Sequence, residues 1–569
     1  MALFSYIGNM KPIDPRTLGI SGTVHQTIFN TCRHVPQKIA FARNDGSGAS
    51  LKYDEIEKLA SRIAGGLKNI GLRKGDRAGI ISHNCPEWGI SYLAALAAGG
   101  TVVPFDSSWK EGEIARAVEV SGVKFIICSH KWNAAIERII ELKNPDIKII
   151  TIDSPSVLNF KSLAESEPFV SSEVLPEDPA VIIYTSGTSG DPKGVILTHR
   201  NITSDLEGIV QALEFYPDDT FLSILPLHHT FESTCGFLTP LLFGLKIVYS
   251  RSLKSRDLLE DIRNQNITCM IGVPLLFEKI YNSISRQIDD LPLHKKISFW
   301  VLYRLSQLGW FMGIKAGGFL FKSMRKAAGM GSLRMMVSGA APLPAQIAKW
   351  FNLIGFDFLE GYGLSECAPV VAVNRVHDIK FGSVGPPLPN IKMEIDNPSP
   401  EGIGEIKVKG PNNTSGYLNN PQASAELLKH GWLCTGDMGK IEKGCLYITG
   451  RKKNVIVSAA GKNIYPEEIE AALHLSPFIL ESVVLGKKKE NKMGEEVHAI
   501  IVPDMEQMKR HFDCDIVSPE PEMIRRVIEQ EVNTINSSLA DYKRLIRFEI
   551  RFNEFEKTTS RKIRRTLYR

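Results

Sequence analysis

The chain has 569 residues, of which 68 are basic and 63 acidic, and its formal charge of +5 is too small to attract nucleic acid through bulk charge. Hydrophobic residues make up 43% and charged residues 23%, proportions of a packed globular protein that exclude a disordered or coiled-coil chain. At roughly 100–200 residues per domain, the length excludes a single small binding module and predicts about three to four units.

The nine cysteines are scattered and form no CxxC pair, which argues against a thiolate metal site and favours a reducing compartment. The first residues lack a basic stretch followed by a full apolar segment, and no uninterrupted apolar run reaches about 18 residues. We therefore expect a cytoplasmic protein without a membrane-spanning helix.

Helix and strand patterns alternate through most of the chain. An amphipathic helix is predicted at 53–67, a buried strand at 78–82, a second helix at 87–98 and another strand at 101–105. The same rhythm predicts further strands at 124–128, 180–184, 246–249 and 269–274. Such alternation indicates parallel or mixed sheets with flanking helices, so we predict a large α/β body over residues 1–450.

The composition changes after residue 450. A basic, glycine-containing stretch leads into a predicted helix at 466–473, and two strands and a long helix follow at 482–485, 497–502 and 522–539. This pattern predicts a small α+β domain over residues 455–569. We expect a hinge at 451–454 to join it to the body.

Residues 184–194 (YTSGTSGDPKG) directly follow the apolar strand predicted at 180–184. Glycine lets backbone N–H groups approach phosphate oxygens, the hydroxyls donate hydrogen bonds, and Lys193 neutralises charge. The segment is not a Walker A loop, because Pro192 precedes the lysine and Gly194 follows it. A Ser/Gly-rich surface turn is the alternative reading of such a sequence.

This segment resembles the AMP-binding signature of the adenylate-forming superfamily, which contains acyl- and aryl-CoA synthetases, luciferases and peptide-synthetase adenylation domains. Later motifs of the superfamily follow in the expected order at 225–229, 337–343, 360–366, 435–437 and Arg451. The resemblance implies an N-terminal AMP-binding domain and a mobile C-terminal domain. The ATP-binding residues that it implies are Thr185, Ser186, Gly187, Thr188, Ser189, Gly190, Lys193, Gly339, Ala340, Ala341, Gly361, Tyr362, Gly363, Ser365, Asp437 and Arg451.

The resemblance also implies roles for the charged residues of these motifs. Lys193 would bind the β- and γ-phosphates of ATP, and Glu366, together with Thr185, would hold Mg²⁺. A carboxylate and phosphate oxygens are ligands that Mg²⁺ prefers, and a lysine suits phosphate charge. Taken alone, each of these side chains is more often an ordinary solvated charge or a helix cap.

The remaining body motifs would bind the nucleoside and the acid. By resemblance, Tyr362 packs on adenine, while Asp437 and Arg451 reach the ribose hydroxyls. His229 would be a mobile gate lining the acyl pocket, although a buried core or turn histidine is the alternative. We interpret His228 as structural.

Residues 555–565 resemble the superfamily's terminal motif, whose lysine bridges the incoming carboxylate and the α-phosphate. This similarity assigns adenylation to Lys562. The superfamily usually has glycine before this lysine, whereas Arg561 stands here, and arginine adopts a positive φ less readily than glycine. The alternative is a basic tail whose charges are solvated.

The resemblance makes Lys453 the pivot about which the C-terminal domain swings after adenylation. Residues 458–463 would then face the active site, with Gly461 along the tunnel for the pantetheine of CoA. One fold would thereby carry out two half-reactions in turn.

Residues 294–326 contain seven basic residues, seven aromatic residues and no acid. Such an amphipathic stretch is typical of an element that lies on an anionic membrane surface, so we expect a peripheral membrane contact here. The alternative is a helical hairpin packed on the body with its charges solvated. The segment precedes 337–343, where bacterial long-chain fatty-acyl-CoA synthetases carry an extra helical segment, and it favours a long-chain acid.

We therefore predict a long-chain fatty acid–CoA ligase that uses ATP and Mg²⁺, forms acyl-AMP with release of pyrophosphate, and transfers the acyl group to coenzyme A. An acyl-AMP ligase that loads carrier-protein pantetheine is one alternative. A catalytically silent lipid-binding or membrane-associated member is another. The sequence predicts no nucleic-acid partner and indicates no oligomeric state.

Overall fold

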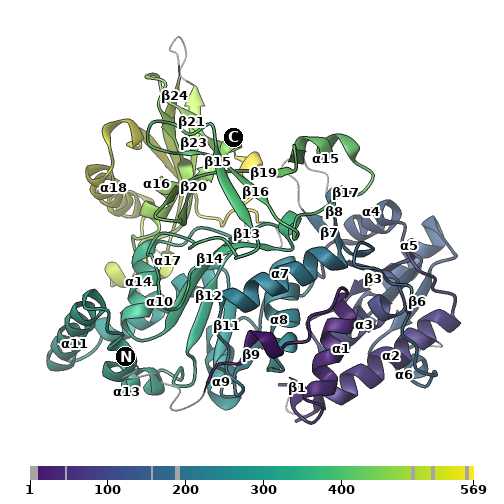
Figure 1. The fold of residues 1–569 in the computed structure, drawn as a ribbon. Helices are drawn as coiled ribbons and strands as arrows, with labels where there is room; N and C mark the ends of the chain where they lie inside the picture. Colours follow the sequence, from purple (N-terminus) through teal and green to yellow (C-terminus); the bar gives the residue numbers. More distant parts are fainter. Residues whose placement is uncertain are drawn as a thin grey trace.

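A computed structural model describes most of the chain, and its parts form several sheets covered by helices (Figure 1). The described residues are 11–44, 48–154, 158–185, 193–488, 494–513, 519–557 and 563–568. Within these ranges, no helix combines the length and the apolar composition needed to cross a bilayer.

The first large sheet has seven strands, and those at its centre are parallel. Its spatial order is β17 (Gly416–Tyr417), β8 (Lys193–Thr198), β7 (Pro179–Thr185), β4 (Thr101–Pro104), β3 (Arg77–Ile81), β5 (Phe125–Cys128) and β6 (Lys148–Thr151). The pairs β7–β8 and β8–β17 are antiparallel. The predicted strands at 78–82, 101–105, 124–128 and 180–184 are confirmed.

The second large sheet has eight strands and is parallel except at its two edges. Its order is β14 (Val370–Val373), β13 (Asp357–Gly363), β12 (Met335–Ser338), β11 (Cys269–Gly272), β9 (Thr220–Ser223), β10 (Lys246–Tyr249), β1 (Ile39–Ala42) and β2 (Ser50–Lys52). The predicted strands at 246–249 and 269–274 lie here. Their side chains are buried because helices cover both faces, as in parallel sheets generally.

Helices form three layers around these two sheets. One hydrophobic core joins both sheets through α1 (Val24–His34), α2 (Tyr53–Asn69), α3 (Pro86–Ala97), α7 (His199–Ala212) and α8 (Thr239–Leu242). Helix α3 is buried almost all round, as expected for an apolar helix between sheets, and the predictions at 53–67 and 87–98 are confirmed. On the far face of the seven-stranded sheet lie α4 (Glu111–Ser121) and α5 (His130–Lys143), and α6 (Phe160–Ala164) packs on α2.

The far face of the eight-stranded sheet has its own core and helices. These are α9 (Ser255–Asn264), α10 (Pro274–Asp289), α11 (Leu293–Phe311), α12 (Gly317–Leu320), α13 (Lys322–Ala327) and α14 (Ala345–Leu353). Helix α11 lies at the outer side of this layer and contacts α10, α12 and α14 (Figure 1).

A third, antiparallel sheet follows in the body, and the helix–strand rhythm of the sequence did not predict it. Its strands are β15 (Lys392–Asp396), β16 (Gly404–Lys409), β19 (Trp432–Glu442), β18 (Leu428–Lys429) and β20 (Cys445–Arg451), with α15 (Pro421–Leu427) inserted before β18. Its core side chains pack on those of β13 and β14, so this sheet extends the body towards the nucleotide motifs.

The C-terminal residues form an α+β unit with a separate hydrophobic core that runs from Ile456 to Leu545. After the short turn η4 (Lys452–Asn454) come β21 (Ile456–Val457), β22 (Asn463–Ile464), α16 (Pro466–Leu473), β23 (Ile479–Lys488), β24 (Glu495–Pro503), α17 (Met505–His511), α18 (Pro521–Ser538) and β25 (Arg547–Ile550). The predicted helix and strand positions in this unit are confirmed. Arg286 of α10 contacts Asp504 at 3.5 Å and Glu506 at 3.7 Å, which joins the unit to the body.

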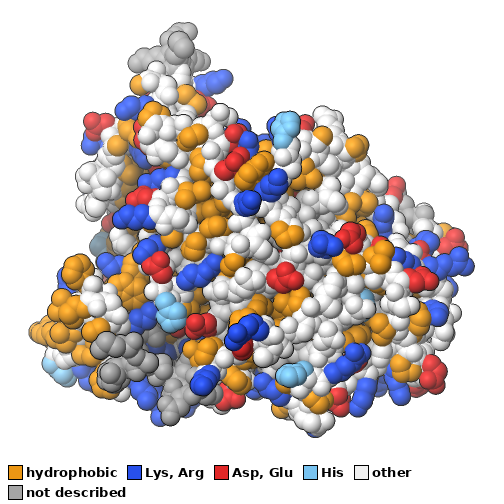
Figure 2. Space-filling view, viewed as in Figure 1, with side chains coloured by type: hydrophobic (Ala, Val, Ile, Leu, Met, Phe, Trp, Pro, Cys, Tyr) orange, Lys and Arg blue, Asp and Glu red, His pale blue; other side chains and the backbone are white. Residues whose placement is uncertain are grey.

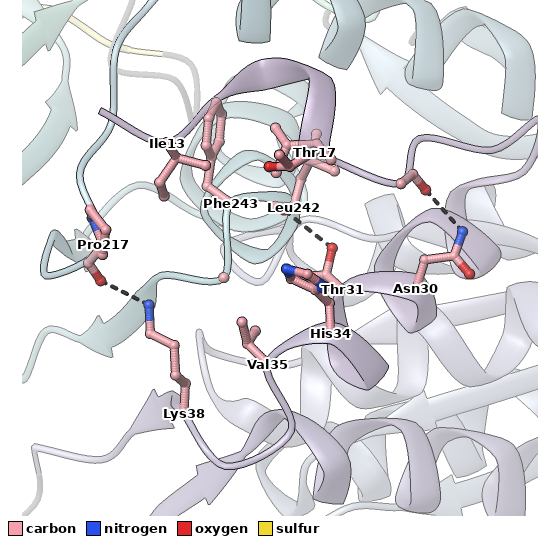
Figure 3. Close-up of a pocket in the computed structure, with 13 residues that line it drawn as sticks. Ile13, Thr17, Asn30, Thr31, His34, Val35, Lys38, Pro217, Leu242 and Phe243 are labelled. Carbon is pink, nitrogen blue, oxygen red and sulfur yellow. Dashed lines mark hydrogen bonds between the residues drawn. The ribbon is translucent and has the colours of Figure 1, made fainter. Parts of the chain in front are cut away.

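A pocket of about 280 Å³ lies between the N-terminal segment, α1 and the end of α8 (Figure 3). The Lys38 ammonium donates to the Pro217 carbonyl at 2.8 Å, and the Thr31 hydroxyl donates to the Leu242 carbonyl at 3.2 Å. The pocket contains none of the predicted site residues, and the polar groups of Lys38 and Thr31 already bond to backbone carbonyls of neighbouring segments.

Candidate active site

The predicted phosphate loop connects β7 to β8. Thr185 and Lys193, its two flanking residues, are register partners, and the Thr185 hydroxyl donates to the Lys193 carbonyl at 3.4 Å. Ser186, Gly187, Thr188, Ser189 and Gly190 lie outside the described residues. The structure therefore places the two ends of the loop at the carboxyl end of β7, where ligands of α/β sheets commonly bind.

Lys193 lies beside a tyrosine that the sequence analysis did not single out. The Lys193 ammonium is 5.0 Å from the centre of the Tyr417 ring, and the Tyr417 hydroxyl donates to Oε1 of Glu366 at 2.7 Å. Burial, followed by the charge of Glu366, raises the pKa of Tyr417 above its ordinary range, so the hydroxyl keeps its proton. Tyr417 thus links Lys193, the predicted phosphate ligand, to Glu366, the predicted metal ligand.

Glu366 fits the predicted magnesium site. It is half-buried in η3 (Ser365–Cys367), which packs against β8, and its backbone carbonyl accepts from the Thr414 N–H at 2.7 Å. Within the described ranges, only Oε1 receives a donor, which leaves Oε2 to ligate a cation. One protein carboxylate together with phosphate oxygens and water is an arrangement that Mg²⁺ accepts. No contact in the described ranges joins Thr185 to Glu366.

Tyr417→Phe should raise the Mg²⁺ concentration for half-maximal pyrophosphate release about 10-fold, because it removes the donor that orients Glu366 but keeps the ring beside Lys193. Mg²⁺ titrations at saturating ATP measure this shift. Tyr542→Phe makes the same change on the exposed C-terminal unit and should leave the titration unaltered. An unchanged Mg²⁺ dependence in Tyr417→Phe would remove the tyrosine from this role.

The residues predicted to bind adenine and ribose form a second cluster. The Tyr362 hydroxyl donates to Oδ2 of Asp437 at 2.8 Å, and Nε of Arg451 lies 3.0 Å from Oδ1 of the same carboxylate. Burial and the adjacent carboxylate raise the pKa of Tyr362 well above its ordinary value. Asp437 and Arg451 are also register partners on β19 and β20, so the strand pairing itself brings them together.

The loop after β12 carries Gly339, Ala340 and Ala341. Ala340 has a φ of 71°, a left-handed conformation that is costly for alanine, and such residues gather at binding loops. A Cβ on Gly339 would come within 2.9 Å of the Phe231 ring. On β13, a Cβ on Gly363 would meet the Pro369 carbonyl at 2.0 Å, whereas Gly361 has ordinary space around it. Glycine at 339 therefore lets the Phe231 ring approach closely, and glycine at 363 lets the Pro369 backbone do so.

The two histidines of the 225–229 motif differ in their surroundings. His228 is buried, and its Nε2 lies 3.4 Å from Oδ2 of the buried Asp106. His229 is less buried, and its ring centre is 4.3 Å from that of His228. The adjacent Thr230 hydroxyl is 3.2 Å from the Ser365 hydroxyl, so the motif lies against η3. Asp106 was missed by the sequence analysis, and its position just after β4 is the only local signal for it.

Asp106, His228 and His229 are also the one group in the described ranges whose side chains could jointly ligate a metal ion. The buried Asp106 carboxylate already accepts from the Ser108 N–H and hydroxyl, at 2.8 and 2.7 Å. These contacts suffice to explain a buried carboxylate beside histidine, so the group supports the structural interpretation of His228.

A π-helix, η2 (Phe231–Leu238), follows the histidines and buries the side chain of Glu232 completely. Burial raises the pKa of Glu232 to about 8, although the Ser223 hydroxyl donates to its Oε1 at 2.6 Å. A carboxyl with a raised pKa contributes stability below its unfolded pKa. That contribution is lost as the pH rises towards 8, because the unfolded chain ionises more readily.

Glu232→Gln should therefore stabilise the protein by an amount that grows between about pH 5 and about pH 8, to roughly 2–4 kcal/mol. The glutamine oxygen can still accept from Ser223. Urea unfolding midpoints across this range measure the gain. Glu141→Gln, on the exposed face of α5, serves as the control, and a pH-independent gain in Glu232→Gln would contradict the assignment.

The C-terminal residues are only partly described. Lys562 lies outside the described residues, and Lys557 and Ile563, the nearest described residues on either side of it, form an isolated β-bridge. Lys453 is exposed in η4 between β20 and β21. Gly461 has a φ of 73° in the β21–β22 turn, and a Cβ there would meet open space. The turn requires glycine for its backbone conformation, and within the described ranges no atom beyond the flanking residues lies within 4 Å of that Cβ position.

The two clusters share one short segment of chain. Tyr362 and Glu366 are four residues apart, so the predicted nucleoside group Tyr362–Asp437–Arg451 and the predicted phosphate group Lys193–Tyr417–Glu366 meet at the end of β13. This arrangement provides a cation, a free carboxylate oxygen and a carboxylate next to an arginine. It can bind a nucleotide together with a divalent ion.

Comparison with known proteins matches most of the body of the chain. The AMP-binding enzyme family matches residues 28–418. The human protein named long-chain-fatty-acid–CoA ligase 1 is 32% identical over 508 residues, which is 81% of this chain and 71% of the human one. A protein named feruloyl-CoA synthase from an Amycolatopsis species is 28% identical and covers 80% of this chain and 84% of its own.

The fold is also similar to that of a solved structure. The ATP-bound MatB from Rhodopseudomonas palustris superposes with a TM-score of 0.77 at 24% sequence identity, over 96% of this chain and 98% of that one. The family match covers more than half of the chain and contains Lys193, Tyr362, Glu366 and Tyr417. The protein therefore belongs to the AMP-binding enzyme family and is an adenylate-forming ligase with a large N-terminal body and a small C-terminal domain.

Proposed function

We propose that this protein is a long-chain fatty acid–CoA ligase that forms acyl-AMP from ATP and the acid, releases pyrophosphate, and then transfers the acyl group to CoA. The observation that carries the proposal is the meeting of the nucleoside and phosphate clusters at Tyr362 and Glu366. A carboxylate is a poor electrophile, so it must become a mixed anhydride before a thiol can displace it. AMP is the activating group, and pyrophosphate leaves.

Each cluster has a task in this displacement. Lys193 and a Mg²⁺ ion on Glu366 would neutralise the phosphate charge that develops as pyrophosphate leaves. Asp437 retains lone pairs for ribose hydroxyls beyond those used by Tyr362 and Arg451, because a carboxylate has about four acceptor sites. The buried hydroxyl of Tyr362 fixes that carboxylate.

The second half-reaction requires the C-terminal domain, and our proposal assigns its parts by the ordered motifs. Lys562 would act in adenylation, residues 451–454 would form the hinge with Lys453 as its pivot, and Gly461 would face the CoA thiol in the second arrangement. The separate core from Ile456 to Leu545 supports such a movement, because the domain can turn without disrupting its own packing.

The identity of the carboxylic acid substrate is the most specific part of the proposal. Relatives of similar identity carry names of long-chain fatty-acid and of feruloyl ligases, and the human long-chain enzyme is the more identical of the two compared.

A pyrophosphate-release panel tests the proposal, with acids from acetate to stearate and with ferulate, each with and without CoA. We expect the highest kcat/KM for long saturated chains and a CoA-dependent thioester product. A preference for ferulate would contradict the proposal that the substrate is a long-chain fatty acid. An acyl-adenylate that hydroxylamine traps but CoA does not consume would contradict the proposal that CoA is the acyl acceptor. Pyrophosphate release that does not depend on the added acid would contradict ligase activity.

A further inference from the structure

Helix α11 presents an apolar stripe to solvent on the side facing away from the body. Ten large hydrophobic side chains of α11, the following turn and α12 are exposed: Leu293, Ile297, Trp300, Val301, Leu305, Leu308, Phe311, Met312, Ile314 and Phe319. On α11 they recur every three or four residues, the spacing of one helix face. Figure 2 shows hydrophobic side chains gathered where Figure 1 places α11.

The opposite face of α11 fixes the helix to the body. Phe299 is buried in the core of the far face, and the buried Ser306 hydroxyl donates to the Leu353 carbonyl of α14 at 2.6 Å. Gly309 is also buried. The stripe is therefore a formed surface, and Phe311 at 89% and Leu293 at 74% exposure mark its two ends.

Charge within the segment that carries the stripe has one sign, and the acids Asp289 and Asp357 on either side of it pair with Lys296 and Lys315. The sequence contains no aspartate or glutamate from residue 291 to residue 356. Lys295, Arg304, Lys322 and Lys326 are exposed and form no ion pair within the described ranges. Lys322 and Lys326 are separated by one turn of α13, so they project from the same face.

We propose that this surface, residues 293–326, is a docking site for an anionic lipid bilayer, with α11 lying in the plane of the interface. An apolar face flanked by lysine and arginine, with tryptophan among its members, fits the boundary between acyl chains and acidic headgroups. The 19 residues of α11 extend roughly 28 Å, which allows broad contact along the surface.

A second copy of this chain fits the surface poorly. A symmetric dimer would place each stripe, with its surrounding bases, against the same bases of the other copy, and the segment offers no acid to pair with them. An acidic lipid surface supplies the missing opposite charge. The inference does not rest on the proposed function, since binding to lipid requires no catalysis.

Sedimentation with vesicles tests the apolar half of the surface. The whole chain should bind vesicles of phosphatidylcholine and phosphatidylglycerol, and the double change Leu305→Glu/Leu308→Glu should weaken binding at least about 10-fold. Leu142→Glu, at an 83% exposed leucine of α5, is the matched control and should bind like the unchanged protein. Thermal unfolding checks that the double variant remains folded, because both leucines face solvent.

The charged half is tested with Lys322→Gln/Lys326→Gln. This variant should lose about 10-fold in binding to the anionic vesicles, and salt should weaken binding of the unchanged protein. Quenching of Trp300 by brominated lipid, absent in Trp300→Phe, should report its entry into the interface. Equal binding to pure phosphatidylcholine, or a lipid-free dimer that Leu305→Glu/Leu308→Glu abolishes, would overturn the proposal.

Discussion

Lys562→Ala should slow acyl-adenylate formation by at least about 100-fold and leave thioester formation from preformed acyl-AMP and CoA within about twofold. The ammonium would contact the carboxylate and the α-phosphate only while the anhydride forms, so its charge serves one half-reaction. Pyrophosphate release measures the first step, and the thioester product from synthetic acyl-AMP measures the second.

A neighbouring arginine provides the control for this change. Arg564 is exposed two residues further along the same basic stretch, and Arg564→Ala removes the same charge. We expect it to retain adenylation within about twofold, because a solvated surface charge interacts only weakly with the α-phosphate and the carboxylate. Equal loss in both variants, or equal loss of both half-reactions in Lys562→Ala, would contradict the role assigned to this lysine.

Lys453→Pro should produce the opposite pattern. Proline fixes φ at the exposed turn between β20 and β21, so the C-terminal domain would be held in one arrangement. We expect adenylation to change less than about twofold and thioester formation to fall by about 100-fold. The same two assays measure the half-reactions separately.

Lys453→Ala removes the side chain but leaves the backbone free to turn, and it should retain most thioester formation. Lys452, the preceding residue, pairs with Glu405 at 2.7 Å and holds the start of the turn to the body. Normal overall turnover in Lys453→Pro would show that the movement does not pass through this residue.

The parallel parts of the fold were predictable from the sequence because their strands are buried on both faces. A short apolar run between two helical patterns, such as 101–105, is typical of a buried strand, and all four residues of β4 are buried. The third sheet was missed because its strands mix polar and apolar residues at half-buried positions. In β15, for example, Lys392 and Glu394 alternate with less exposed neighbours, a weaker pattern than a continuous run.

The candidate site divides in the same way. Motif residues such as Glu366 and Asp437 could be identified individually, because their segments resemble those of a superfamily. The side chains that contact these motif residues could not be identified from the sequence. Tyr417 reaches Glu366 only through the pairing of β17 with β8, and the Tyr362 hydroxyl meets Asp437 across 75 residues of chain. Such contacts depend on strand register, which no local pattern records.

The strand order of the two large sheets also constrains how the chain can be assembled. β1 and β2 belong to the eight-stranded sheet, and β1 pairs with β10, which is synthesised about 200 residues later. In the seven-stranded sheet, the last neighbour of β8 is β17, which begins only at residue 416. Neither sheet is complete on a ribosome until the other has been almost entirely synthesised. The edges that β14 and β17 cover therefore stay unpaired until these late strands have been synthesised, and exposed edges of this kind favour aggregation.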